Sequence, residues 1–191
     1  MLYCCISWRS KSTRSARPMG NNELEIIDIT QISNYTINMT NKIGFCCIYV
    51  QPDAKKGFVS VPDLNTSTTT VAWLKRQTQA VAEQKLWDLM VHNIESAKLL
   101  VQKVGTLDEQ LRMVRLSSDI LPVYTEPNFG YFWQQDYTRS YAEKHFAKVG
   151  ELARSLGVRL SFHPGQFCVL ASSDDDVVRR SIEEFEYHVD M

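Results

Sequence analysis

From residue 43 onward, apolar positions alternate between short continuous runs and longer stripes with helical spacing. The runs Ile43–Val50, Leu111–Leu116 and Val158–Phe162 are typical of strands, and the nearly unbroken first run predicts burial on both faces. Stripes that recur every three or four residues predict one helix after each run. The stripe residues are Leu86, Leu89, Met90, Ile94, Ala97, Leu100, Val101 and Val104 in the first helix, Tyr137, Tyr141, Phe146, Val149, Leu152, Ala153 and Leu156 in the second, and Val178, Ile182, Phe185 and Val189 in the third.

Glycine, proline and acidic residues mark where these elements begin and end. Gly105 and Gly157 follow the first two helical stripes, as expected at helix C-termini. Residues 51–70 are polar and contain prolines and a glycine, which predicts a loop. Asp174–Asp176 favours the start of the third helix, because acidic side chains there complement the helix dipole.

The order of these elements predicts the fold class. Strand and helix alternate three times, which favours an α/β fold with parallel strands and helices outside. A complete (β/α)8 TIM barrel takes about 250 residues, whereas the chain has 191. We therefore expect the first three βα units of a TIM barrel, with the chain ending before the barrel closes.

Residues 1–40 do not follow this pattern. Arg9–Arg17 is rich in arginine and serine and lacks acidic residues, and Asn21–Asn41 is polar. Met39 stands immediately before Thr40-Asn41-Lys42, which lead into the first convincing strand. This leader has three interpretations: disordered or mistranslated upstream sequence, a targeting segment, or a short accessory tail. We expect the folded domain to cover residues 41–191.

Composition narrows the classes of function. Hydrophobic residues make up 44% and charged residues 23%, as in soluble globular proteins. The 21 basic and 22 acidic residues give a net charge of −1, so any contact with nucleic acid must come from a local patch. No apolar window is long enough for a membrane span. We expect an intracellular protein, because no secretory signal opens the chain.

The cysteines indicate neither a zinc site nor a disulfide framework. None of the five has the C-x-x-C spacing of a zinc knuckle. We expect reduced, buried thiols. The five are Cys4, Cys5, Cys46, Cys47 and Cys168.

The richest candidate chemistry follows the third strand. His163 comes directly after it, and Pro164–Gly165 then turns the chain toward Gln166 and Phe167. Functional residues of parallel α/β folds gather at the carboxyl ends of strands. There an imidazole suits a divalent metal ion, and an amide beside an aromatic ring suits an unstacked base. A hydrogen-bonded structural histidine is the alternative for His163.

The second strand is followed by further polar residues. Ser117, Ser118 and Asp119 can bind phosphate or cap the next turn. Glu126 is a possible oxygen ligand for Mn2+ or Mg2+, or a solvated loop carboxylate. The remaining histidines lie on predicted helices, where we expect surface or helix-packing roles; they are His92, His145 and His188.

Three ordered segments resemble the UV damage endonuclease family: Lys42–Phe45, Arg115–Pro122 and Leu160–Phe167. Asn93, on the helix before the second strand, fits the same order. The resemblance covers residues 42–191. It implies a TIM-barrel repair endonuclease that uses divalent metal ions, commonly manganese, and nicks DNA on the 5′ side of UV photoproducts to leave a 3′-hydroxyl.

The resemblance also implies roles for single residues. His163 would be catalytic as a metal ligand, and Gln166 with Phe167 would probe the damaged dinucleotide. Phe45 would lie near the lesion, and Ser118 would contact the DNA. Glu126 stands where many relatives have a histidine, so its role as a second ligand departs from the family pattern. UV-damaged double-stranded DNA would be the partner, and the full-length protein would be a monomer.

Two alternatives belong to other classes of function. A metal-dependent sugar isomerase or epimerase uses the same kind of barrel, and its sugar-binding residues would lie on later strands. An inactive partial chain that binds DNA weakly, or folds only with further sequence, is the non-enzymatic alternative. The pair Gln166–Phe167 and the Arg-Ser-Ser segment at the end of the second strand favour DNA.

Overall fold

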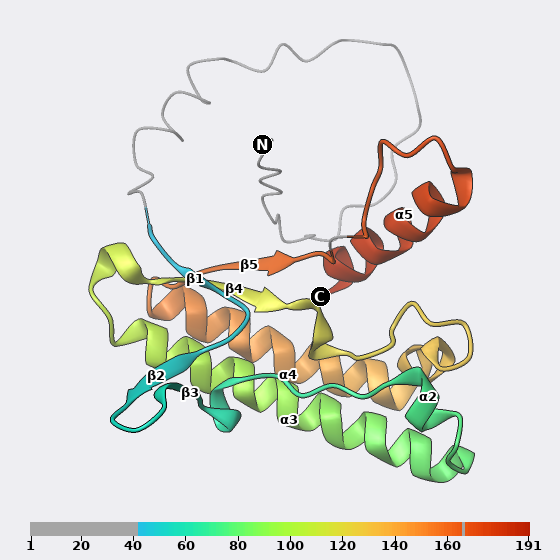
Figure 1. Ribbon diagram of the computed structural model, residues 1–191, viewed down its shortest axis with the longest axis horizontal. Coiled ribbons are helices and arrows are strands. Elements are labelled where there is room, and N and C mark those ends of the chain that lie inside the picture. The colour runs from blue at the N-terminus through green and yellow to red at the C-terminus, as the bar shows by residue number, and fades with distance from the viewer. Residues whose placement is uncertain (1–41, 166) are drawn as a thin grey trace, which may run out of the picture. The chain divides into compact units, whose positions relative to one another are not determined.

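The computed structural model describes residues 42–165 and 167–191. The leader predicted over residues 1–40 and the candidate site residue Gln166 lie outside the described residues. Within the described part, three strands form a parallel sheet in the order β1-β4-β5 (Figure 1). They are β1 (Phe45–Cys46), β4 (Met113–Ser117) and β5 (Arg159–His163). The predicted α/β class with parallel strands is therefore confirmed, and closure into a barrel stays a prediction.

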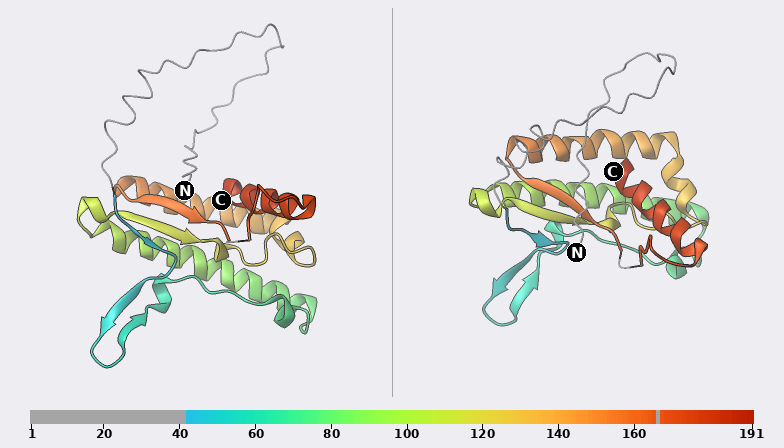
Figure 2. Two further views of the ribbon diagram at one scale, coloured as in Figure 1. Left: turned by 45° about the horizontal axis from the view of Figure 1, so that its top comes forward. Right: turned by 90° about the horizontal axis from the view of Figure 1, so that it is seen from above.

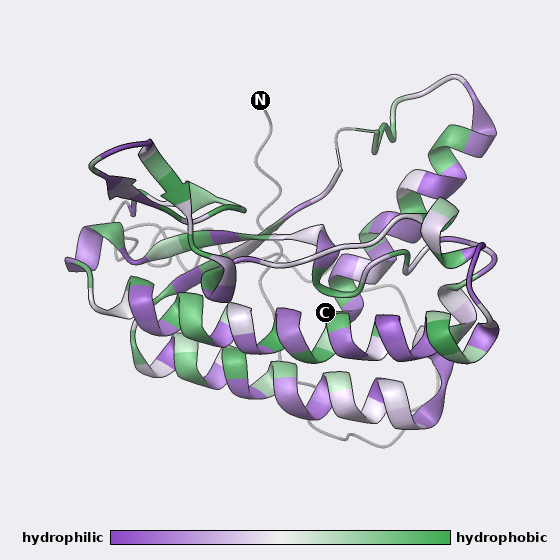
Figure 3. Cartoon of the chain, turned by 60° about the horizontal axis from the view of Figure 1, so that its bottom comes forward, coloured by the Kyte–Doolittle hydropathy of each residue, from purple (hydrophilic) through white to green (hydrophobic). Residues whose placement is uncertain are grey.

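Two long helices cover one face of this sheet. They are α3 (Gln79–Gly105) and α4 (Asp136–Ser155), which lie side by side beneath the strands in two views (Figures 1 and 2). Apolar and polar positions alternate around each helix (Figure 3). The apolar stripe of α3 enters the core with Leu86, Met90 and Val101, which are all fully buried, as predicted. In α4, Val149 is buried as predicted, but Tyr137 is 55% exposed.

The third helix, α5 (Asp175–Asp190), lies beyond the carboxyl end of β5 (Figure 1). It begins at Asp174, whose side chain accepts hydrogen bonds from the backbone nitrogens of the next turn, so the predicted acidic start is confirmed. The predicted inner face is wrong for two of its four residues. Val178 and Phe185 are half-buried, but Ile182 and Val189 are 45% and 60% exposed, because the fully packed face carries Ser181, Glu184 and Tyr187.

The first predicted strand is also corrected. The run from Ile43 to Val50 forms only the two-residue β1, and Ile43 and Ile48 are 70% and 60% exposed. β1 is an edge strand that pairs only with β4 among the described strands. It ends because Cys47 adopts φ 63° while the Ile48 nitrogen donates to the Cys46 oxygen, which is a γ-turn.

The segment predicted as a loop contains regular structure. The strands β2 (Val50–Asp53) and β3 (Gly57–Ser60) form an antiparallel hairpin. The Asp53 carboxylate accepts hydrogen bonds from two backbone nitrogens of the turn, and Gly57 provides the positive φ of 75°. The remaining short elements are η1 (Pro62–Leu64), α2 (Val71–Leu74), η2 (Glu109–Leu111), η3 (Ser118–Ile120) and η4 (Gly130–Gln134).

No helix in the described ranges has the length and apolar character that crossing a membrane requires.

Candidate functional site

The register of the sheet separates an apolar face from a polar one. Val114 and Leu116 of β4 are buried toward the helices, so the residues between them face the other way. In the parallel pairing, Arg115 lies opposite Ser161, and Ser117 lies opposite His163. The polar face therefore ends, at the carboxyl edge of the sheet, in Ser117 and His163.

Ser118 joins the two strand ends to α5. Its hydroxyl donates to the backbone oxygen of His163. Nε2 of His188 lies 3.0 Å from the same hydroxyl oxygen, and Nδ1 of His188 lies 2.6 Å from the backbone oxygen of Glu184. This chain of hydrogen bonds connects β4, β5 and α5, and it fixes the backbone of His163.

The contact between His188 and Glu184 lies inside the protein. A carbonyl oxygen only accepts, so Nδ1 of His188 donates to the backbone oxygen of Glu184. The nearer carboxylate oxygen of Glu184 lies 4.0 Å from the same nitrogen. The side chains of His188 and Glu184 are only 7% and 9% exposed, so this contact is shielded from water.

Tyr187 adds a second connection between α5 and the turn after β4. Its hydroxyl donates to the Ser118 oxygen at 2.7 Å and accepts from the Leu121 nitrogen at 3.1 Å. Burial raises the pKa of the Tyr187 phenol above its ordinary value, so the hydroxyl keeps the proton that it donates. Tyr187 thus holds the turn after β4 at two points, the backbone oxygen of Ser118 and the backbone nitrogen of Leu121.

The predicted DNA-contacting residues lie in different surroundings. Phe167 is 68% exposed beside Gly165, where a Cβ would lie 2.3 Å from the Phe167 ring. Phe45 is half-buried on the core side of the sheet, in register with Val114, and its ring lies 5.7 Å from that of Tyr49. Phe45 thus packs on the opposite face of the sheet from His163. Its DNA contact stays a prediction.

The serines after β4 are engaged within the protein. Ser117 accepts a hydrogen bond from the Asp119 nitrogen and caps the short helix η3, which is the capping role named as an alternative. The hydroxyl of Ser118 is occupied by His163 and His188. A DNA contact by Ser118 also stays a prediction.

Glu126 lies apart from His163, in the loop after β4. Both of its carboxylate oxygens accept hydrogen bonds from Asn128, at 2.7 Å each. Glu126 lines a cavity of about 400 Å³ between this loop and α5, and His163 does not. The lining residues are Tyr124, Thr125, Glu126, Pro127, Gly130, Tyr131, Gln134, Glu183, Glu186, Tyr187 and Asp190.

The described residues taken alone do not fit a complete metal site. In residues 42–165 and 167–191, no group of three or more His, Cys, Asp or Glu side chains is placed to hold a metal ion. The imidazole of His163 lies on the polar face, but the carboxylate of Glu126 is turned toward Asn128. Metal ligation by His163 and Glu126 stays a prediction.

Sequence reasoning missed the contribution of α5 to this edge of the sheet. His188 was expected to have a surface or helix-packing role, and the structure buries it beside Ser118 and the ring of Phe162. A usable signal existed: Ser181, Glu184 and His188 recur at helical spacing and define a polar stripe. The competing apolar stripe predicts the other face, because burial of apolar residues is the common case.

Comparison with known proteins gives one family and several relatives. Residues 41–191 match the family model described as UV-endonuclease UvdE. The UV-damage endonuclease of Neurospora crassa is 37% identical over 81 residues, which cover 42% of this chain and 12% of that protein. The UV DNA damage endonuclease of Bacillus mycoides is 28% identical over 124 residues, which cover 64% of this chain and 36% of that protein.

A solved structure has a similar fold. The crystal structure of SacUVDE matches with a TM-score of 0.54 at 23% identity, over 66% of this chain and 39% of that chain. The chain therefore spans between 12% and 39% of the length of these three proteins.

Proposed function

The chain belongs to the UV-endonuclease UvdE family, and from this premise we propose that it acts in DNA repair as an endonuclease on UV-damaged double-stranded DNA. The proposed reaction is hydrolysis of the phosphodiester backbone on the 5′ side of a photoproduct, which leaves a 3′-hydroxyl. The observation that supports it most is the position of His163. This residue ends the polar face at the carboxyl edge of the sheet, and its backbone is held by Ser118.

His163 is the residue that we propose to touch the reacting phosphodiester. A neutral imidazole can accept the proton of an attacking water molecule or bind a divalent metal ion. The hydrogen bond from Ser118, whose hydroxyl also contacts His188, would hold its backbone in place during the reaction, so that the side chain needs little reorganisation. A divalent metal ion, manganese or magnesium, is part of the proposal, and His163 and Glu126 are the residues of this chain that we propose as its ligands.

Recognition of the lesion would use Gln166 and Phe167, which follow His163 in the sequence. The ring of Phe167 is open to solvent and can stack on an extruded base. Gln166 would hydrogen-bond the damaged dinucleotide beside it. A photodimer is already poorly stacked and paired, so its extrusion costs less than that of a normal step, and this difference would select damaged sites.

A nicking assay on a duplex with one cyclobutane dimer tests the proposal. We expect the chain with Mn2+ to cut next to the dimer on its 5′ side, and EDTA to abolish cutting if the ion is required. His163→Ala should lower the rate by about 100-fold or more, since a positioned proton-transfer group contributes at least that factor. The matched control is His145→Ala, because His145 stacks on Tyr141 of the same helix and should leave the rate within about twofold.

The relative from Bacillus mycoides serves as the positive control in this assay. If that enzyme nicks the duplex and the 191-residue chain does not, the proposal of activity for this chain is contradicted, and the inactive partial chain becomes the better description. Cutting that persists in His163→Ala would contradict the role of His163 alone.

A further inference from the structure

Cys46 and Cys47 are neighbours in the sequence and also touch through their sulfur atoms. The two Sγ atoms lie 3.2 Å apart, close enough for one thiol to donate a hydrogen bond to the other. Both thiols are free, Cys46 is exposed and Cys47 is half-buried. The expectation of a buried thiol is therefore wrong for Cys46. An accessible pair of thiols in contact is the arrangement from which a disulfide can form.

The backbone explains why these two sulfur atoms meet. Successive side chains of a strand point to opposite faces of the sheet, which keeps neighbouring thiols apart. Here the strand ends at Cys46, because Cys47 adopts φ 63° and the Ile48 nitrogen donates to the Cys46 oxygen at 2.7 Å. The Cys47 nitrogen also donates to the Arg115 oxygen of β4 at 2.8 Å, which holds the turn against the sheet.

We propose that Cys46 and Cys47 form a redox-sensitive vicinal dithiol, which hydrogen peroxide or an organic hydroperoxide converts reversibly to a disulfide. With hydrogen peroxide, the Cys46 thiolate attacks one peroxide oxygen, the O–O bond breaks, and a sulfenic acid and a hydroxide form. The hydroxide takes up the proton that the Cys46 thiol released on ionisation and becomes the first water. The Cys47 sulfur then attacks the sulfenic sulfur, the S–S bond forms, and the S–O bond breaks. A second water leaves with the Cys47 proton, so two thiols lose two electrons and one peroxide becomes two waters.

The two cysteines have different roles in this sequence. Burial, together with the neighbouring Cys46 thiol, raises the pKa of Cys47 to about 12, so Cys47 is almost entirely protonated at neutral pH. The thiolate is the nucleophile in the first step. Cys46 is exposed to the oxidant and is therefore assigned the first attack, and Cys47 resolves the sulfenic acid.

The disulfide should be easily reduced. The Cα atoms of neighbouring residues lie about 3.8 Å apart across a trans peptide bond, and disulfides usually span about 4.4 Å or more. The resulting strain raises the reduction potential, and strained, exposed disulfides are the labile class. Cys47 carries the backbone bond to Arg115, so ring closure would act directly on the end of β1.

Peptide mass spectrometry tests this proposal without reference to DNA nicking. The intact chain is treated with hydrogen peroxide, free thiols are blocked with iodoacetamide, and trypsin then releases Ile43–Lys55, which contains Cys46 and Cys47 as its only cysteines. We expect this peptide to appear unblocked and lighter by two hydrogen atoms, and to regain both thiols after dithiothreitol. Cys46→Ser and Cys47→Ser should each abolish the change. Cys168→Ser should leave it, because Cys168 lies on the tryptic peptide Leu160–Arg179.

A synthetic peptide with the sequence of residues 43–55 separates the effect of the fold from that of adjacency. The disulfide yield should be higher in the folded chain, because the turn at Cys47 brings the sulfur atoms together. Equal yields would overturn the role assigned to the fold. Addition of oxygen atoms to Cys46 without a disulfide, a cross-link from Cys46 to another cysteine, or no reaction would overturn the proposal itself.

Discussion

The residue that does most to place the candidate site is Asn93, which touches none of the expected reacting groups. It is fully buried on α3, and its side-chain nitrogen donates to the Asp119 oxygen at 2.7 Å and the Ile120 oxygen at 3.2 Å. The same side-chain amide accepts a hydrogen bond from the backbone nitrogen of Ser67 and donates one to the backbone oxygen of Ser67. One side chain thus connects a helix, the loop before α2 and the turn after β4, whose first residue is Ser118.

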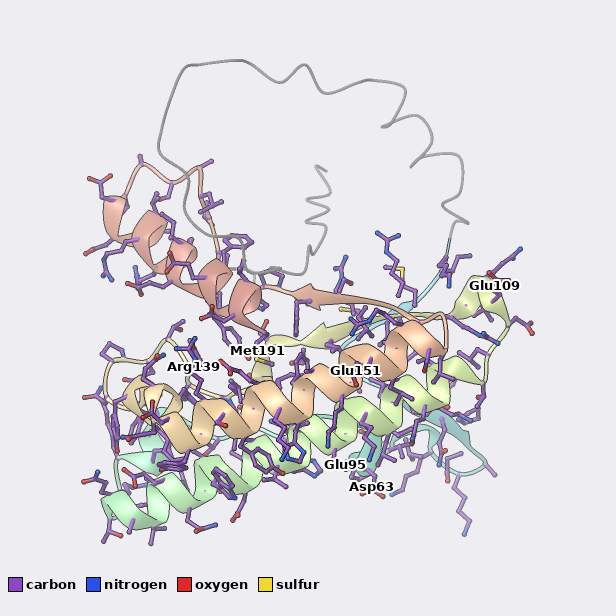
Figure 4. The ribbon with its side chains drawn as sticks, turned by 180° about the vertical axis from the view of Figure 1, so that it is seen from behind. Asp63, Glu95, Glu109, Arg139, Glu151 and Met191 are labelled. Atoms are coloured by element: carbon purple, nitrogen blue, oxygen red, sulfur yellow. The ribbon has the colours of Figure 1, made fainter. Side chains whose placement is uncertain are left out.

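Replacing Asn93 by alanine should lower the free energy of unfolding by about 3 kcal/mol, because the change removes a fully buried side chain together with its four hydrogen bonds to backbone groups. Urea unfolding followed by circular dichroism measures this change. Glu95→Gln is the matched control on the same helix. Glu95 lies on the outer surface (Figure 4) in an exposed ion pair with Lys98, so the control should change stability by less than about 0.5 kcal/mol. Equal effects of the two substitutions would contradict the role of Asn93.

At the scale of elements, the edge strand β1 is the least secure part of the sheet. It has two residues and one neighbouring strand among the described elements. Its approach to β4 depends on Gly44, where a Cβ would lie 2.1 Å from the Met113 oxygen and 2.6 Å from its carbonyl carbon. Those atoms belong to the backbone of the neighbouring strand and cannot rotate away, so only glycine allows this spacing.

Gly44→Ala should separate β1 from β4 and lower the free energy of unfolding by about 2 kcal/mol or more. Hydrogen exchange should also become faster at the Cys47 amide, which donates to Arg115 of β4. The comparison is Gly150→Ala inside α4, where the nearest atom lies at an ordinary contact distance of 3.5 Å. This change should stabilise the protein by about 0.5–1 kcal/mol, because alanine favours a helix. A neutral result for Gly44→Ala would show that β1 tolerates a wider spacing.

At the scale of the whole domain, stability comes from the layer between the sheet and the pair α3 and α4. Leu86 and Met90 of α3 and Val149 of α4 are fully buried in one cluster that also contains Val114 of β4. α5 adds the buried ring of Tyr187 to this cluster, and it adds hydrogen bonds to the turn at Ser118. His163 and Ser118 themselves lie at the margin of the core, so they can be changed without loss of the core.

Leu86→Ala should lower the free energy of unfolding by about 2–5 kcal/mol, because it leaves a cavity in this layer. Val81→Ala, on the same helix at 48% exposure, should change it by less than about 0.5 kcal/mol. Both values come from urea unfolding of the purified chain, monitored by tryptophan fluorescence. Comparable losses for the two variants would place the stabilising contacts outside the layer between the sheet and the helices α3 and α4.

Local periodicity by itself determined the parallel α/β class, the helices α3 and α4, and the position of His163 at a strand end. These features follow from residues close in sequence, because helix and strand periods record which positions face a core. The predicted strand from Ile43 to Val50 fails for a different reason: its length depends on how many neighbours the strand has, and β1 has one in the described sheet.

Only the tertiary structure decided which face of α5 is packed and what surrounds Ser118. The helix carries two stripes, an apolar one with Ile182 and a polar one with Glu184 and His188, and periodicity alone favours the apolar one. The polar stripe is packed because His188 meets Ser118, which lies 70 positions earlier, and Tyr187 meets the same turn. Hydrogen bonds between groups so distant in sequence depend on how the elements dock, and this information is absent from any local pattern.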